Sequence, residues 1–138
     1  MPTLYRLVAP LAAAFATTFA APAAPAATLG LHLASVHLPQ RDFNNFNPGV
    51  YVRSDAGWTA GAYYNSLERV SVYGGYTWQR GPLGLTAGAA TGYDRAVQPI
   101  LVPSLIVATI GEVSARIAYI PRVEKRIESH VLHLMLEY

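Results

Sequence analysis

Ser66 and two upstream histidines are the side chains in this sequence that could support nucleophilic catalysis. A serine hydroxyl is a weak nucleophile until a base takes its proton, and histidine is the usual base. Ser66 lies in the segment 64–69, and the two histidines are His32 and His37. Acyl transfer is the chemistry that such a pair performs. Spacing alone favours an ordinary turn role for Ser66, because serine is common in turns.

The elements that position these residues are predicted to be β-strands. Apolar and polar side chains alternate with a period of two after residue 26, and turn residues interrupt the alternation about every ten positions. The boundaries predict strands at 28–38, 49–54, 58–65, 70–79, 83–91, 101–110, 112–120 and 129–138. This pattern is typical of an all-β barrel or sandwich.

Residues 1–26 are predicted to be a secretory signal peptide that lies outside the fold. Arg6 precedes an uncharged apolar run over 7–21, and Ala24-Pro25-Ala26 offers a small-x-small cleavage site. The run is shorter than the roughly 20 residues that a transmembrane helix needs. The folded domain is therefore expected to occupy residues 27–138.

The composition predicts an exterior that contacts hydrocarbon. Hydrophobic residues make up 52% of the chain and charged residues only 13%, whereas a soluble surface carries roughly 25–35% charged residues. Small residues on the polar strand faces suit the narrow interior of eight strands. The final Tyr138, after an alternating strand, resembles the sorting signal of outer-membrane barrels. The prediction is an eight-stranded antiparallel transmembrane β-barrel in the outer membrane, with a soluble secreted barrel as an alternative.

The same numbers exclude several classes of protein. A net charge of +2 is too small for a nucleic-acid-binding face, and the absence of cysteine excludes disulfides. His130 and His133 are three apart on one predicted strand, so they face opposite ways and cannot chelate one metal. The interpretation calls for no metal and no cofactor, and the protein is expected to be a monomer.

The parity of the strands places the candidate side chains. His32 shares a face with Gly30 and lies opposite Leu31, so it is expected to point into the lumen. His37 has the other parity, and a β-bulge would turn it inward. A lumenal ion network that plugs the barrel is predicted from Glu112, Arg116, His133 and Glu137.

Several segments, in order, resemble the lipid A palmitoyltransferases of the Gram-negative outer membrane. They are Tyr64-Asn65-Ser66 through Gly75-Tyr76-Thr77-Trp78, then Leu85-Thr86-Ala87-Gly88, Gln98-Pro99-Ile100-Leu101-Val102-Pro103-Ser104 and Ala118-Tyr119-Ile120-Pro121. The resemblance covers about residues 30–138. It implies an eight-stranded barrel that moves a palmitoyl chain from a phospholipid to lipid A with a rim Ser, Asp and His.

The resemblance also assigns roles to residues. Ser66 matches the serine, His32 matches the histidine best, and Asn65 stands where the family has its aspartate. Thr77 replaces a glycine, which predicts a shallower pocket and a transferred chain shorter than palmitoyl. The family's N-terminal amphipathic helix is missing, and the family's use of prolines as lateral openings in the wall points to Pro99, Pro103 and Pro121.

The complete prediction is a lipid acyltransferase-like barrel whose partners are phospholipid and lipid A, with no nucleic acid. The catalytic candidates are Ser66, His32, Asn65 and His37, and the substrate-binding candidates are Thr77, Gly75, Arg69 and Tyr64. Arginines near loops or strand ends could meet lipid A phosphates or act as solvated caps: Arg41, Arg53, Arg69, Arg95 and Arg122. The alternative function is a non-catalytic small outer-membrane barrel with a structural or lipid-binding role.

Overall fold

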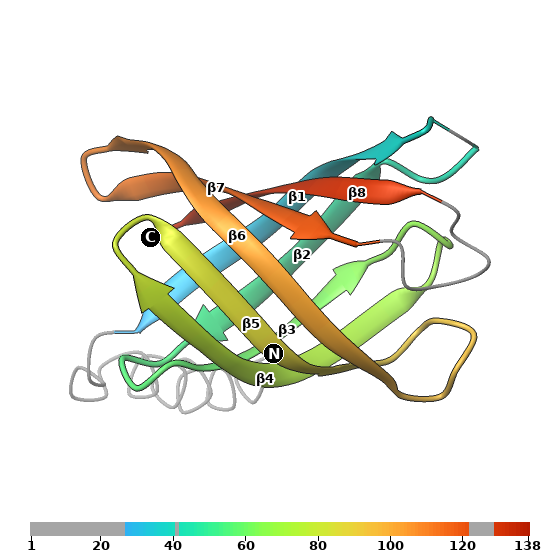
Figure 1. Ribbon diagram of the computed structural model, residues 1–138, viewed down its shortest axis with the longest axis horizontal. Coiled ribbons are helices and arrows are strands. Elements are labelled where there is room, and N and C mark those ends of the chain that lie inside the picture. Colours follow the sequence, from blue (N-terminus) through green and yellow to red (C-terminus); the bar gives the residue numbers. More distant parts are fainter. Residues whose placement is uncertain (1–26, 41, 122–128) are drawn as a thin grey trace, which may run out of the picture.

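The chain forms a closed antiparallel barrel of eight strands (Figure 1). The computed structural model describes residues 27–40, 42–121 and 129–138, so the predicted signal peptide lies outside the described residues. The strands are β1 (Thr28–Leu38), β2 (Phe46–Arg53), β3 (Trp58–Tyr64), β4 (Val70–Arg80), β5 (Leu83–Ala90), β6 (Gln98–Ile110), β7 (Val113–Ile120) and β8 (His130–Glu137). The prediction of an all-β, eight-stranded antiparallel barrel is confirmed.

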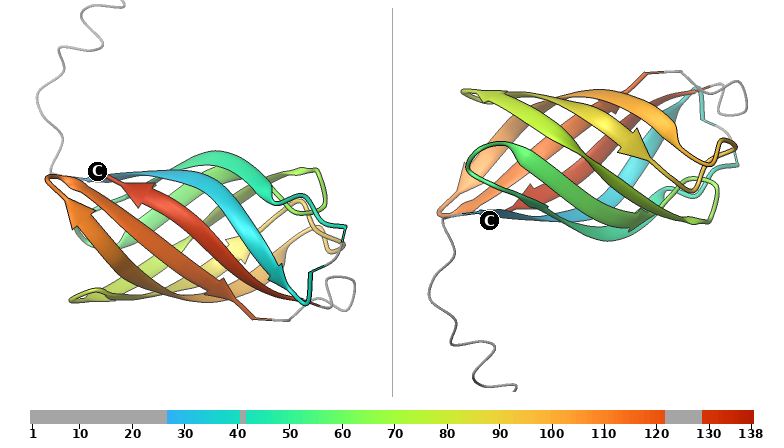
Figure 2. Two further views of the ribbon diagram at one scale, coloured as in Figure 1. Left: turned by 90° about the horizontal axis from the view of Figure 1, so that it is seen from above. Right: turned by 90° about the horizontal axis from the view of Figure 1, so that it is seen from below.

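Each strand pairs with the next, and β8 returns to β1 to close the sheet. The closure continues to the chain end, where Leu29 and Tyr138 exchange two backbone hydrogen bonds of 2.8 Å. The strands run obliquely across the barrel (Figure 2). Among the described residues no helix is long and apolar enough to cross a membrane.

The two ends of the barrel differ. At one end lie Thr28, Tyr138 and the short turns after β2, β4 and β6; we call this the turn end. At the other end lie the longer connections after β1, β3, β5 and β7; we call this the loop end. Ser66 belongs to the connection between β3 and β4 and therefore lies at the loop end.

The apolar and polar faces are inverted relative to a soluble barrel. Large apolar side chains on the outside are more than half exposed, among them Leu29, Val50, Trp58, Val72 and Leu101. The interior contains mainly polar side chains, because the buried residues include histidines, serines, threonines, asparagines, an arginine and a glutamate. Buried and exposed residues alternate along β4, β7 and β8, as the predicted period of two requires.

A bulge in β1 changes which residues face inward. His32 pairs with Met135 of β8, whereas Ala34 pairs with Leu134, so Leu33 is one extra residue in β1. His32 points inward on one side of the bulge, and Ser35 and His37 point inward on the other. A bulge that turns His37 inward, which the sequence allowed, is therefore present.

The hydrogen-bond ladder between β6 and β7 stops short of the loop end, and we call this part of the barrel wall incomplete. Pairing of these two strands begins at Ser104 with Ala118, so the first part of β6 pairs only with β5. Pro103 directly precedes the first paired residue, and its ring nitrogen has no hydrogen to donate. The prediction began this strand at Leu101, but it begins at Gln98, because the segment keeps its ladder with β5 through Pro99 and Pro103.

Candidate functional site

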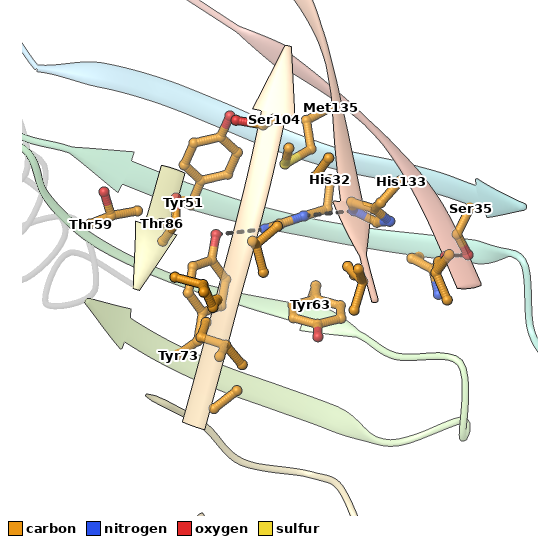
Figure 3. A pocket seen from close by; sticks show the side chains of 18 of the residues that line it. His32, Ser35, Tyr51, Thr59, Tyr63, Tyr73, Thr86, Ser104, His133 and Met135 are labelled. Carbon is orange, nitrogen blue, oxygen red and sulfur yellow. Dashed lines mark hydrogen bonds between the residues drawn. The ribbon is translucent and has the colours of Figure 1, made fainter. Parts of the chain in front are cut away.

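A cavity of about 160 Å³ lies inside the barrel, and all eight strands contribute to its lining. It extends from Ser66 and Tyr93 near the loop end to Arg116 and Glu137 near the turn end. Within the cavity, His32 lies between Tyr73 and His133 (Figure 3). Ser66 and His32 therefore both line one cavity.

His32 is held by partners on both ring nitrogens. Its Nδ1 is 2.8 Å from Nε2 of His133, and its Nε2 is 2.9 Å from the hydroxyl of Tyr73. The rings of Tyr51 and Tyr63 also pack beside it, with centroids 5.1 and 4.9 Å away. All of these side chains are at least partly buried, so the imidazole is fixed inside the lumen.

Ser66 does not touch His32. Its carbonyl oxygen accepts a hydrogen bond of 3.2 Å from the backbone of Asn44, which ties its turn to the connection after β1. The described residues include no hydrogen-bond partner for the Ser66 hydroxyl. The hydrogen-bond partners of His32 are His133 and Tyr73. The hydroxyl is thus available to a molecule in the cavity.

Asn65 is fully buried and organises the turn that carries Ser66. Its side-chain oxygen accepts hydrogen bonds from the backbone of Leu67 and Arg69 at 2.8 and 3.1 Å. Its side-chain nitrogen donates to the Ser71 hydroxyl and to the Gly92 carbonyl, both at 2.9 Å. Asn65 therefore shapes the loop end and contacts neither candidate histidine.

His37 lies beyond the cavity lining. Its Nδ1 is 2.7 Å from the side-chain oxygen of Asn45, and its ring lies 4.8 Å from that of Phe43. It is fully buried, and its Nε2 has no partner among the described residues. These contacts give His37 a place in the packing of the loop end, and none of them is with Ser66.

The substrate-binding candidates separate into two pairs. Thr77 lines the cavity, and its hydroxyl lies 2.9 Å from that of Thr59 and 2.8 Å from that of Thr86. Gly75 faces inward, where a Cβ would lie 2.2 Å from the carbonyl oxygen of Ala87, so glycine is required by the approach of β5. The other two, Arg69 and Tyr64, are exposed at the loop end outside the cavity lining.

A polar plug closes the lumen near the turn end. It consists of Tyr51, Arg53, Gln79, Ser104, Arg116 and Glu137. Glu137 accepts hydrogen bonds from Arg53, Arg116 and Tyr51 at 2.7 to 3.0 Å. Arg116 donates further to Ser104 and Gln79.

The plug differs in part from the predicted ion network. Arg116 and Glu137 belong to it as predicted, whereas Glu112 is exposed in the turn after β6 and His133 pairs with His32. Arg53 joins the plug because the parity of β2 points it inward near Glu137. Arg41 and Arg122 lie outside the described residues, and Arg95 is exposed.

Sequence reasoning missed Tyr73 and His133 as the neighbours of His32. The contact with Tyr73 joins β1 to β4 across the lumen, and the contact with His133 is diagonal between the paired strands β1 and β8. Parity does not specify such contacts. The described residues contain no group of three His, Cys, Asp or Glu side chains that could hold a metal. No protein-family model matches the chain, and a search of curated proteins finds no relative.

Proposed function

We propose that this chain is an outer-membrane enzyme that transfers an acyl chain from a phospholipid to lipid A. The observation that carries the proposal is a cavity, lined by Ser66 and His32, beside an incomplete barrel wall. Ile100 and Val102, from the part of β6 that is not paired with β7, line the same cavity together with Ile120 and Pro121. The proposal is that an acyl chain enters from surrounding lipid between these segments of β6 and β7, where no ladder hydrogen bonds have to be broken.

The membrane location is supported by the inverted barrel. The outward side chains are large and apolar on every strand, and the closed ladder satisfies the backbone without water. An exterior of this kind is stable in hydrocarbon and aggregates in water. With the signal peptide that the sequence predicts, an outer-membrane position is the consistent one, and both termini then face the periplasm.

The proposed reaction needs only a proton acceptor and a site for the ester. The acceptor hydroxyl of lipid A forms a new ester bond with the acyl carbon, and the old bond to the phospholipid oxygen breaks. The acceptor proton passes through His32 to the leaving oxygen, which departs as a lysophospholipid hydroxyl. The Ser66 hydroxyl lies at the loop end of the cavity, where the ester group would remain while the chain lies inside.

The test is mass spectrometry of lipid A from Gram-negative cells that lack their own lipid A acyltransferase and express this chain. The wild type is expected to add one acyl chain, and both Ser66→Ala and His32→Phe are expected to abolish the addition. Ser114→Ala, at the turn end, is the matched control and keeps activity. Heat-dependent gel migration checks that each variant is folded. Wild-type acylation by Ser66→Ala would overturn the catalytic assignment.

A non-catalytic lipid-binding barrel is the second candidate. The observation that favours it is that Ser66 and His32 make no contact and that Asn65 is engaged in its own turn. In that case lipid A stays unmodified, and the protein extracted in mild detergent carries a bound acyl lipid. Native mass spectrometry of the extracted protein measures this outcome directly.

A further inference from the structure

The contact between His32 and His133 supports an inference about how the base is oriented. Both imidazoles are buried, and their facing nitrogens lie 2.8 Å apart. They come from opposite ends of the sequence: His32 precedes the β1 bulge, and His133 pairs with Ser35 beyond it. Because His32 pairs with Met135, it lies diagonally across from His133 on the neighbouring strand, and the bulge falls between the two pairing positions.

The hydrogen bonds of His32 are linked, because a neutral imidazole carries only one N–H. If the Tyr73 hydroxyl donates to Nε2 of His32, then Nδ1 of His32 carries the hydrogen and donates to His133. If His133 donates instead, then Nε2 of His32 carries the hydrogen and donates to Tyr73. A phenol is a good donor and a poor acceptor, since its oxygen lone pair is delocalised into the ring. The first arrangement is therefore the favoured one.

We propose that His133 is a positioning residue that holds His32 in the Nδ1–H tautomer, so that Nε2 keeps the lone pair that takes a proton once the Tyr73 hydroxyl gives way to the substrate. This inference rests on the proposed acyl transfer and extends it to a residue outside the Ser66–Asn65 turn. A proton that arrives on Nε2 creates an imidazolium whose Nδ1–H points at the lone pair of His133. The positive charge is then shared between two rings of equal intrinsic basicity.

A neutral histidine in this position also fits the environment. The usual orienting group is a carboxylate, which would have to be buried as a charge before the reaction begins. His133 is 5% exposed and its neighbours include aromatic rings, so an uncharged partner avoids that desolvation. The charged plug lies farther along the same strand, where Glu137 is already paired with two arginines.

The inference is tested on the full mature protein folded in lipid nanodiscs, with imidazole ¹⁵N NMR as a readout that does not depend on transfer. The wild-type His32 is expected in the Nδ1–H form. His133→Phe keeps a ring but removes the acceptor. The Nδ1–H of His32 would then have no acceptor in a buried site, whereas Tyr73 can still accept from Nε2–H, so His32 should change to the Nε2–H form. His133→Gln restores an acceptor and should restore the Nδ1–H form. His130→Phe, whose histidine stacks on Tyr119 at the surface, is the matched control.

The same variants are assayed for acyl transfer. His133→Phe should lower kcat about 100-fold with little change in KM, and His133→Gln should recover part of the loss. If His133→Phe does not fold, Tyr73→Phe tests the same point, because it removes the phenol and leaves the histidine pair intact. His32 should then stay in the Nδ1–H form, and a change to the Nε2–H form would show that Tyr73 and not His133 sets the tautomer. An Nε2–H tautomer in the wild type, or an unchanged tautomer in His133→Phe, overturns the inference.

The two proposals can fail separately. If the wild type transfers no acyl chain but the tautomer changes as expected, the catalytic role of His133 fails with the proposed function and the pairing itself stands. If transfer occurs and His133→Phe keeps full kcat, the proposed function stands and the positioning role is wrong.

Discussion

The side chain of Asn65 is fully engaged inside the turn that carries Ser66. Two of its four hydrogen bonds are donated by its amide nitrogen, one of them to the carbonyl of Gly92, which lies 27 positions later in the chain. A carboxylate at this position could keep the two bonds that it accepts but would have no hydrogen to donate. It would also face a carbonyl oxygen in a buried site.

Asn65→Asp is therefore expected to destabilise the barrel by about 1–3 kcal/mol and to leave acyl transfer no faster than in the wild type. The ring nitrogens of His32 already have partners, so a new carboxylate at the rim has no base to orient. Urea unfolding in lipid vesicles measures the stability, and lipid A mass spectrometry measures the transfer. Increased transfer by Asn65→Asp would contradict the conclusion that residue 65 shapes the turn and does not orient a catalytic base.

Thr77 limits the space inside the cavity because its side chain is held in place by two other hydroxyl groups. It is 5% exposed and bonded to both Thr59 and Thr86, so its side chain occupies space that an acyl chain would otherwise use. Thr77→Gly is expected to accept longer chains, because each additional buried methylene contributes about 0.8 kcal/mol.

Transfer from a donor mixture of phospholipids with different chain lengths tests the role of Thr77. Thr77→Val, which has the same shape without the hydroxyl, should keep the wild-type profile. An unchanged profile in Thr77→Gly would show that the chain ends above this residue.

At the scale of the strands, parity predicted the barrel and most inward faces but not the local irregularities. His32, Tyr73 and Thr77 face inward as alternation requires, because a period of two is a property of the backbone. The bulge at Leu33 adds one residue to one strand, and the sequence carries no local signal that locates it. The partners of Asn65 and His32 were also hidden, since these contacts depend on how distant strands curve around the lumen.

The bulge makes a specific prediction about β1. Deleting Leu33 removes the extra residue relative to β8 and keeps Ser35 and His37 facing inward, so the variant is expected to fold. Inserting one alanine after Ser35 turns His37 outward and Val36 inward, and this variant is expected not to fold. Heat-dependent gel migration after refolding into detergent distinguishes the two. If both variants fold equally well, folding does not depend on which side chains of β1 point into the lumen.

At the scale of the whole molecule, the plug joins strands that are not neighbours in the barrel. Glu137 of β8 is bonded to Arg53 of β2 and Arg116 of β7, and Arg116 continues to Gln79 of β4. Removing the single carboxylate leaves two arginines without their counter-charge in a buried site. A buried pair broken from one side costs about 3–5 kcal/mol.

Glu137→Ala is expected to lower the free energy of unfolding by that amount, and Glu137→Gln by less, because the amide oxygen still accepts hydrogen bonds. Asp55→Ala, in the exposed turn after β2, is the control and should have no effect. The measurement is urea unfolding in lipid vesicles, followed by tryptophan fluorescence. A Glu137→Ala barrel as stable as the wild type would show that the plug adds nothing to the stability of the fold.

The plug also has an electrical consequence. An ion that moved along the barrel axis would have to pass guanidinium and carboxylate groups whose hydrogen bonds cross the lumen from β8 to β2 and from β7 to β4. We therefore expect the plug to oppose the passage of ions. A planar bilayer containing many copies of this barrel should remain as insulating as bare lipid, and under the proposed function lipid would reach the cavity from the side while the membrane keeps its solute gradients.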